Sequence, residues 1–320
     1  MVSLQFLLLV FVAFFLMVGL KPQAAFALSS TDHPQRIALV TGSNKGIGIE
    51  IVRKLGSEKK KKNNSSDNAF FCILGCRNED LGRAAVEKLK SEGIMDIEFI
   101  RIDLQDLDSI KNAVQQIEET YGRCDFLVNN AAVCYNDPTL YGTTSHTPFA
   151  DQAEITVKTN FFGTLALTKA ILPLMEKSSD SPRIINIASS AGRLSILPSQ
   201  DRRDVFSSDK LRMEDLESYM VDFIQAAKRG THKKEGWPNT GYGVSKVGII
   251  AMTKILARDN KNNKFMVNSI DPGYCSTDQN NNQGFISAER GAITPYLLAT
   301  IEPERYVTGM HWYQEKEIEW

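Results

Sequence analysis

Tyr242 and Lys246 are the residues whose types and spacing most directly suggest chemistry. They lie four positions apart in the run 241–248, Gly-Tyr-Gly-Val-Ser-Lys-Val-Gly, so on a helix their side chains share one face. An ammonium beside a phenol favours the phenolate, and we expect it to lower the pKa of Tyr242 from about 10 toward neutrality. Such a phenol could exchange a proton with the oxygen of a carbonyl or an alcohol. A surface lysine over a half-buried tyrosine has the same spacing, so other positions must support this interpretation.

The composition is that of an ordinary globular protein. It gives no sign of nucleic-acid binding, of a disulfide framework or of a metal site. The chain has 320 residues, 42% hydrophobic and 23% charged, with a formal net charge of −1. This charge gives no electrostatic reason to expect a nucleic-acid partner. The five cysteines are odd in number and lack zinc-type spacing, so we expect neither a disulfide framework nor a metal site. They are Cys72, Cys76, Cys124, Cys134 and Cys275.

The N-terminal segment carries a targeting signal. Residues 4–20 are nearly all apolar, and the run 25–27, Ala-Phe-Ala, follows them, which is typical of a signal-peptide cleavage site. A helix over 4–20 would span about 25 Å, which is short for a membrane crossing. We expect residues 1–28 to be a cleaved signal peptide or a retained signal anchor. Either implies the secretory pathway or endoplasmic reticulum, with a cytoplasmic location as the alternative and membrane contact only through 4–20.

From residue 36 onward, short β-rich runs alternate with helix-length amphipathic segments. Strands are predicted at 37–40, 70–74, 97–102, 126–128, 184–187 and 265–270, and helices at 49–55, 81–90, 107–121, 153–175 and 242–257. This alternation predicts an α/β domain with a parallel sheet covered on both faces. We place that domain at 34–320. Within it, 193–239 is an insertion with its own helix at 213–227.

The loop after the first strand could hold a dinucleotide. It reads Thr-Gly-Ser-Asn-Lys-Gly-Ile-Gly over 41–48. Glycines there would let the backbone approach a pyrophosphate at the positive end of the next helix. The spacing differs from the G-x-G-x-x-G of other dinucleotide folds, so a ligand-free turn is the alternative.

The ends of the second and third strands indicate which dinucleotide the loop would bind. The second strand ends in Arg77, and an arginine there, together with Lys45, suits the 2′-phosphate of NADP, whereas a carboxylate would suit NAD. Asp103 and Leu104 follow the third strand and are expected beside the adenine, although a capping role would also explain Asp103. We therefore expect NADP(H).

In order, these motifs resemble the short-chain dehydrogenase/reductases. The resemblance covers 36–320 and is closest to the monomeric carbonyl reductases, a branch that includes plant ketone reductases of the salutaridine and menthone type. Its general motifs are T-G-x-x-x-G-x-G at 41–48, Asn-Asn-Ala at 129–131, Asn160, Ser189, Tyr242-x-x-x-Lys246 and Pro272-Gly273. The passages 157–164, 232–238 and the closing Glu319-Trp320 resemble that branch in particular.

The resemblance implies the roles of the site residues. Tyr242 would be the general acid in reduction, and Lys246 would lower its pKa and hydrogen-bond the nicotinamide ribose. Ser189, chosen over Ser190 because Gly192 then follows three residues on, would donate to the substrate oxygen. Asn160 would hold a water that links Lys246 to solvent. The expected cofactor contacts are Gly42, Ser43, Asn44, Lys45, Gly46, Ile47, Gly48, Arg77, Asp103, Leu104, Asn130, Ala131, Tyr242, Lys246, Pro272, Gly273 and Thr277.

The long interval between Ser189 and Tyr242 is typical of the same branch. There, such an insertion covers the helices that other members use to dimerise, which implies a monomer whose insertion forms one wall of the substrate pocket. The expected substrate contacts are Ser189, Tyr242, Trp237 and Tyr274, with Ile196 and Leu197 beside them, and ordinary packing is the alternative for the apolar four. Two positions depart from the family pattern, Ala132 for a glycine and Asp271 for an uncharged residue.

The sequence thus predicts a single doubly wound Rossmann domain with a seven-stranded parallel sheet of order 3-2-1-4-5-6-7. The predicted activity is NADPH-dependent reduction of a ketone or aldehyde on a small molecule. An NADP-dependent alcohol or hydroxysteroid dehydrogenase working in the oxidative direction is one alternative. A non-catalytic NADP(H)-binding sensor is another, and retention of 4–20 would favour a membrane-tethered enzyme acting on lipid carbonyls.

Overall fold

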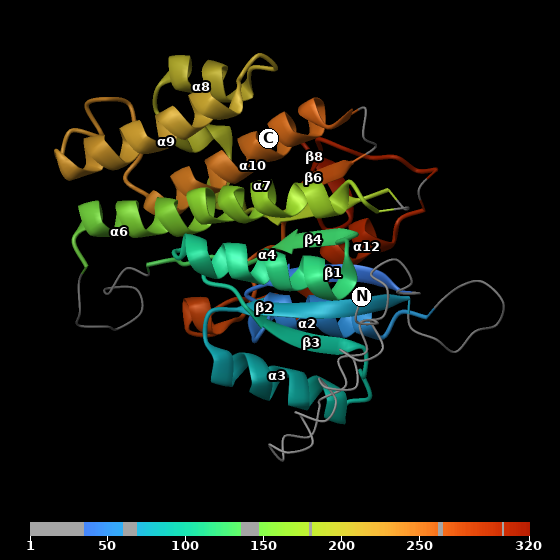
Figure 1. Ribbon diagram of the computed structural model, residues 1–320. Coiled ribbons are helices and arrows are strands. Elements are labelled where there is room, and N and C mark those ends of the chain that lie inside the picture. Colours follow the sequence, from blue (N-terminus) through green and yellow to red (C-terminus); the bar gives the residue numbers. More distant parts are fainter. Residues whose placement is uncertain (1–34, 60–68, 136–146, 179–180, 262–264, 303) are drawn as a thin grey trace, which may run out of the picture.

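The computed structural model describes residues 35–59, 69–135, 147–178, 181–261, 265–302 and 304–320 (Figure 1). The expected targeting segment 1–28 and its apolar run 4–20 lie outside the described residues. No helix in the described ranges is long and apolar enough to cross a membrane.

A single eight-stranded sheet lies at the centre of the molecule, in the order β3-β2-β1-β4-β5-β6-β7-β8. The strands are β1 (Arg36–Thr41), β2 (Phe70–Cys76), β3 (Ile97–Arg101), β4 (Phe126–Asn129), β5 (Arg183–Ile187), β6 (Met266–Asp271), β7 (His311–Tyr313) and β8 (Lys316–Ile318). Neighbouring strands from β3 to β7 pair in parallel, and β8 runs antiparallel to β7. The predicted order of the first seven strands is confirmed.

The eighth strand corrects the prediction of seven. It forms a hairpin with β7 around Gln314 and Glu315, whose φ angles are 46° and 60°. Two-residue hairpin turns with both φ values positive are usually signalled by Asn-Gly or Asp-Gly. Gln-Glu gives no such signal, and the two strands are only three residues long.

Helices cover both faces of the sheet, with a separate apolar core on each side (Figure 1). One face carries α2 (Gly46–Gly56), α3 (Glu79–Ser91), α11 (Ala288–Gly291) and α12 (Ile293–Thr300). The other carries α4 (Leu107–Tyr121), α6 (Phe149–Val157), η1 (Lys158–Gly163), α7 (Thr164–Met175) and α10 (Gly241–Asp259). Burial on both faces explains why the central strands β4 and β5 are buried along their whole length.

The insertion forms a third layer outside α6 and α10. It follows η2 (Ser190–Gly192), and its elements are η3 (Leu194–Ile196), α8 (Gln200–Ser207) and α9 (Met213–Lys228). In Figure 1 the yellow helices α8 and α9 lie beyond α6 and α10 from the sheet. A Cβ on Gly248 would lie 2.9 Å from the sulfur of Met220, so this glycine lets α10 approach α9 closely. Nearly every residue of α10 is buried as a result.

The predicted helix 153–175 is interrupted at one point. Residues 158–163 form the π-helical turn η1 between α6 and α7. Such turns are rare inside helices and frequently mark functional sites. This one contains Asn160, which the sequence had singled out.

Candidate active site

Tyr242 and Lys246 lie in the first two turns of α10, next to the carboxyl end of β5. Thr240 caps the start of the helix, and its hydroxyl accepts a hydrogen bond from the amide of Gly243 at 2.9 Å. The Lys246 ammonium lies 5.4 Å from the centre of the Tyr242 ring. It also donates to the carbonyl of Ile187, the last residue of β5, at 2.6 Å. This bond fixes the start of α10 against the sheet.

Burial controls the acidity of both groups. It lowers the pKa of Lys246 to about 8, because a buried ammonium loses its hydration. It raises the pKa of the Tyr242 phenol, and the hydrogen bonds that Gln279 and Ser189 make with the phenol only partly oppose this effect. The expectation that Lys246 lowers the Tyr242 pKa is therefore wrong for this arrangement, since desolvation of the phenolate dominates.

The structure separates the two neighbouring serines. Ser189 begins η2, and its oxygen accepts from the amide of Ala191 at 3.1 Å, which leaves its own O–H to donate. Its hydroxyl contacts the Tyr242 phenol, whereas the hydroxyl of Ser190 contacts the Asp271 carboxylate. A Cβ on Gly192 would lie 2.7 Å from the Lys246 carbonyl carbon. The glycine therefore allows the Ser189 turn to lie against α10.

Asp271, the unexpected carboxylate, lies at the end of β6 and is almost fully buried. It accepts a hydrogen bond from the amide of Gly273 at 2.9 Å and another from Ser190. Burial raises the pKa of this carboxyl. Asp271 thus ties the loop after β5 to the loop after β6, which accounts for a charged residue at this position.

Asn160 connects the segment after β4 to α10. Its amide nitrogen donates to the carbonyl of Val133 at 2.9 Å and to the hydroxyl of Ser245 at 3.1 Å, and its oxygen accepts from the amide of Val133 at 2.8 Å. The side chain is 1% exposed. These bonds give Asn160 a structural role, and the water that it was expected to hold stays a prediction.

A cleft of about 300 Å³ lies beyond the carboxyl ends of the first strands and begins at the glycine loop. Most of the expected cofactor contacts line it: Gly42, Asn44, Lys45, Gly46, Ile47, Arg77, Asp103, Leu104, Asn130, Ala131 and Thr277. Those that do not line it are Ser43, Gly48, Tyr242, Lys246, Pro272 and Gly273. Ser43 is fully buried, and its hydroxyl donates to the carbonyl of Val40 at 2.6 Å, so it shapes the loop from inside.

The glycine loop has the form that an anionic dinucleotide requires. Gly42 has φ +63°, and a Cβ there would lie 2.8 Å from the Ala131 backbone. Gly46 has φ +57° and opens toward the cleft at the start of α2. The side chain of Asn130 donates to the carbonyls of Thr41 and Gly42 at 2.9 and 3.1 Å, and so supports the loop from behind. A glycine-lined helix N-terminus of this kind suits a diphosphate.

Several residues that line the cleft or influence the Tyr242–Lys246 pair were not predicted. Asp278 and Gln279 line the cleft directly after Thr277, so their position in the sequence could have indicated them. Cys134 lies close enough to Tyr242 and Lys246 to influence both, and burial raises the pKa of its thiol. The other unpredicted lining residues are Cys76, Asn78, Leu81, Ile102, Gln105, Ala132, Val133 and Thr159.

Among the residues expected to form the substrate wall, Tyr274 has an exposed side chain. Its ring is 41% exposed and packs edge-on against Phe285, which is 84% exposed, with 5.7 Å between ring centres. Ile196 is partly exposed, while Leu197 is fully buried in the core.

Trp237 corrects the expectation. Its side chain is fully buried between Phe206 and Phe223, and the guanidinium of Arg202 lies 3.7 Å from the centre of the ring. The indole nitrogen donates to the carboxylate of Asp222 at 3.2 Å. Trp237 therefore belongs to the core of the insertion and does not form part of the substrate wall.

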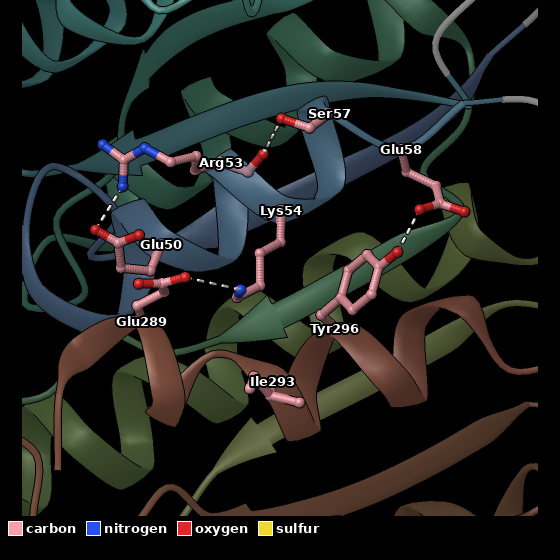
Figure 2. Close-up of a pocket in the computed structure, with 8 residues that line it drawn as sticks. All are labelled: Glu50, Arg53, Lys54, Ser57, Glu58, Glu289, Ile293 and Tyr296. Carbon is pink, nitrogen blue, oxygen red and sulfur yellow. Dashed lines mark hydrogen bonds and ion pairs between the residues drawn. The ribbon is translucent and has the colours of Figure 1, made fainter.

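A larger groove of about 800 Å³ lies between α2 and the α11–α12 segment (Figure 2). Its cations already have carboxylate partners: Arg53 pairs with Glu50, and Lys54 lies 3.7 Å from Glu289. None of the predicted catalytic side chains lines it. The smaller cleft is not lined by them either, but it contains the glycine loop and most of the expected cofactor contacts, and it is therefore the candidate cofactor site.

Known proteins share this sequence and fold. The family profile described as short chain dehydrogenase matches residues 36–198. The chain is 35% identical to carbonyl reductase [NADPH] 1 of Rattus norvegicus, over 91% of this chain and 99% of that protein. It is 38% identical to carbonyl reductase [NADPH] 3 of Mus musculus, over 84% of this chain and 92% of that protein.

Two solved plant structures resemble the fold over nearly the same extent. Salutaridine reductase from Papaver somniferum is 28% identical, with a TM-score of 0.75 over 87% of this chain and 99% of that chain. Menthone neomenthol reductase from Mentha piperita is 27% identical, with a TM-score of 0.72 over 88% and 99%.

The placement of Trp237 predicts an effect on stability. We expect Trp237→Leu to lower the free energy of unfolding by about 2–4 kcal/mol, because it leaves a cavity in the insertion core. Tyr274→Leu, at a half-exposed position, should change it by no more than about 0.5 kcal/mol. Urea unfolding followed by circular dichroism measures both, and equal effects would contradict the assignment of Trp237 to the core.

Proposed function

The chain belongs to the short-chain dehydrogenase/reductase family, and from that premise we propose that it reduces a ketone or aldehyde to the alcohol with NADPH. One observation carries the proposal. The Tyr242 phenol, the Ser189 hydroxyl and the buried ammonium of Lys246 meet beside a glycine-lined cleft that also holds Lys45 and Arg77. The [NADPH] carbonyl reductases that the chain resembles support both the cofactor and the reaction class.

Different residues of the cleft would bind different parts of the cofactor. The backbone of the glycine loop and the N-terminus of α2 would face the diphosphate, and Lys45 and Arg77 would hold the 2′-phosphate through charge-assisted hydrogen bonds. Bound NADPH supplies the hydride. The protein supplies the proton and the orientation of the substrate.

Tyr242 would donate the proton to the substrate oxygen. Because burial raises its pKa, the phenol stays protonated at neutral pH and can donate to the substrate oxygen. The O–H of Ser189 would turn from the phenol to the same oxygen and donate to it as negative charge develops there. The Lys246 ammonium, 5.4 Å from the ring centre, would then stabilise the phenolate that the transfer leaves behind.

The direct test is oxidation of NADPH by the purified protein with quinones, aromatic ketones, steroid ketones and terpenoid ketones. We expect Tyr242→Phe to lower kcat by about 10² or more, the scale of general acid catalysis. NADPH binding, followed by nicotinamide fluorescence, should be retained. Tyr219→Phe, a matched change in the insertion, should keep full activity. Unchanged turnover in Tyr242→Phe would refute its role, and cofactor binding without turnover of any carbonyl would favour the sensor or the oxidative dehydrogenase.

The pH dependence of kcat/KM for NADPH should reflect the ionisation of Lys246. Its pKa falls from 10.5 to about 8 in the folded chain, so the positive charge is complete below that pH and is lost as pH rises through it. We expect kcat/KM for NADPH, which reflects ionisations of the free enzyme, to decline above about pH 8. Lys246→Arg keeps its charge, so any activity that it retains should not decline there. The same decline in that variant would assign the ionisation to another group.

We also propose a monomer, because α9 covers the outer sides of α6 and α10. In solution the full chain should behave as one 35.7 kDa particle. Light scattering after size-exclusion chromatography measures this mass. A stable dimer at micromolar concentration would show that the insertion leaves another surface for association.

A further inference from the structure

A compact turn after β6 lines one part of the cleft. It comprises residues 277–283, the cleft turn, and it includes the short helix η5 (Asp278–Asn280). Thr277 donates its amide proton to the side chain of Asn280 at 3.2 Å, and its carbonyl accepts from the amide of Asn282 at 2.9 Å. The Thr277 methyl would lie 3.4 Å from a Cβ on Gly46. The turn is therefore folded on itself and touches the glycine loop on the opposite side of the cleft.

The first contact across the cleft is an ion pair. The Lys45 ammonium lies 2.9 Å from the Asp278 carboxylate, and both side chains are about 60% exposed. Lys45 is the cation that the proposed function assigns to the 2′-phosphate. A carboxylate in that position neutralises Lys45 and repels an incoming phosphate, so Asp278 and the phosphate compete for the same partner.

The second contact reaches the reacting group. Gln279 lines the cleft, and its side-chain amide hydrogen-bonds the Tyr242 phenol. That phenol is the group that the proposed function assigns to the substrate carbonyl. This bond lowers the pKa of the phenol, so the amide is its donor and the phenol O–H stays available to the substrate oxygen.

We propose that the cleft turn is a built-in competitor for the cofactor, in which Asp278 holds Lys45 against the 2′-phosphate. Asp278 is then a determinant of how strongly the site prefers NADPH to NADH. The inference rests on the proposed function, since Lys45 is the cation that it assigns to the 2′-phosphate.

The competition between Asp278 and the phosphate is tested by binding alone. Titration of the full chain with NADPH, followed by nicotinamide fluorescence at low ionic strength, should show Asp278→Asn binding about two- to fivefold more tightly, the scale of an exposed ion pair. NADH lacks the 2′-phosphate, so its affinity should stay unchanged. In a Lys45→Met background, Asp278→Asn should have no effect. Weaker NADPH binding by Asp278→Asn, or equal tightening for NADH, would overturn the inference.

Gln283→Leu, at an exposed position of the same turn, is the control and should leave the affinity for NADPH unchanged. If no carbonyl is reduced at all, the proposed function fails, and the Asp278→Asn titration still decides the inference.

Discussion

The structure of the site depends on a buried ammonium held at the end of a central strand. Lys246 donates to the carbonyl of Ile187 at 2.6 Å while it is 3% exposed. A buried cation is costly unless it is hydrogen-bonded, so this bond fixes α10 over β5. The close approach also needs Gly192, because any side chain there would collide with the Lys246 backbone. Tyr242 and Ser189 meet because this one contact brings their two elements together.

A buried polar network extends the same constraint along the helix. The amide of Asn129 on β4 donates to the side-chain oxygen of Asn186 on β5 at 2.8 Å, and the amide of Asn186 donates to the hydroxyl of Thr253 on α10 at 2.8 Å. Unsatisfied polar groups in a core cost more than hydrogen-bonded ones, so these bonds set the position of α10 along the strands. The insertion completes the burial, since α9 covers the side of α10 that would otherwise face water.

Much of this arrangement could be predicted from the sequence, because each predicted feature has a local signal. The alternation of strand and helix gave the parallel sheet, and the resemblance to the family gave its strand order. The motifs at 41–48 and 242–246 gave the glycine loop and the catalytic pair. What could not be predicted depends on tertiary contacts. Burial decides the sign of the Tyr242 pKa shift, and it moves Trp237 from the expected pocket wall into a core. The β7–β8 hairpin is short and has unusual turn residues.

The two unexpected carboxylates show how environment separates roles that sequence leaves equivalent. Asp271 and Asp278 lie seven positions apart in the sequence, at the end of β6 and in the turn that follows it. Asp271 is 6% exposed and accepts hydrogen bonds from Gly273 and Ser190, so removing it would leave buried donors without partners. Asp278 is mostly exposed and pairs only with a cation that water also hydrates, so its pair is weak enough to open. The buried carboxylate therefore stabilises the loops around the site, and the exposed one can yield its partner to a phosphate.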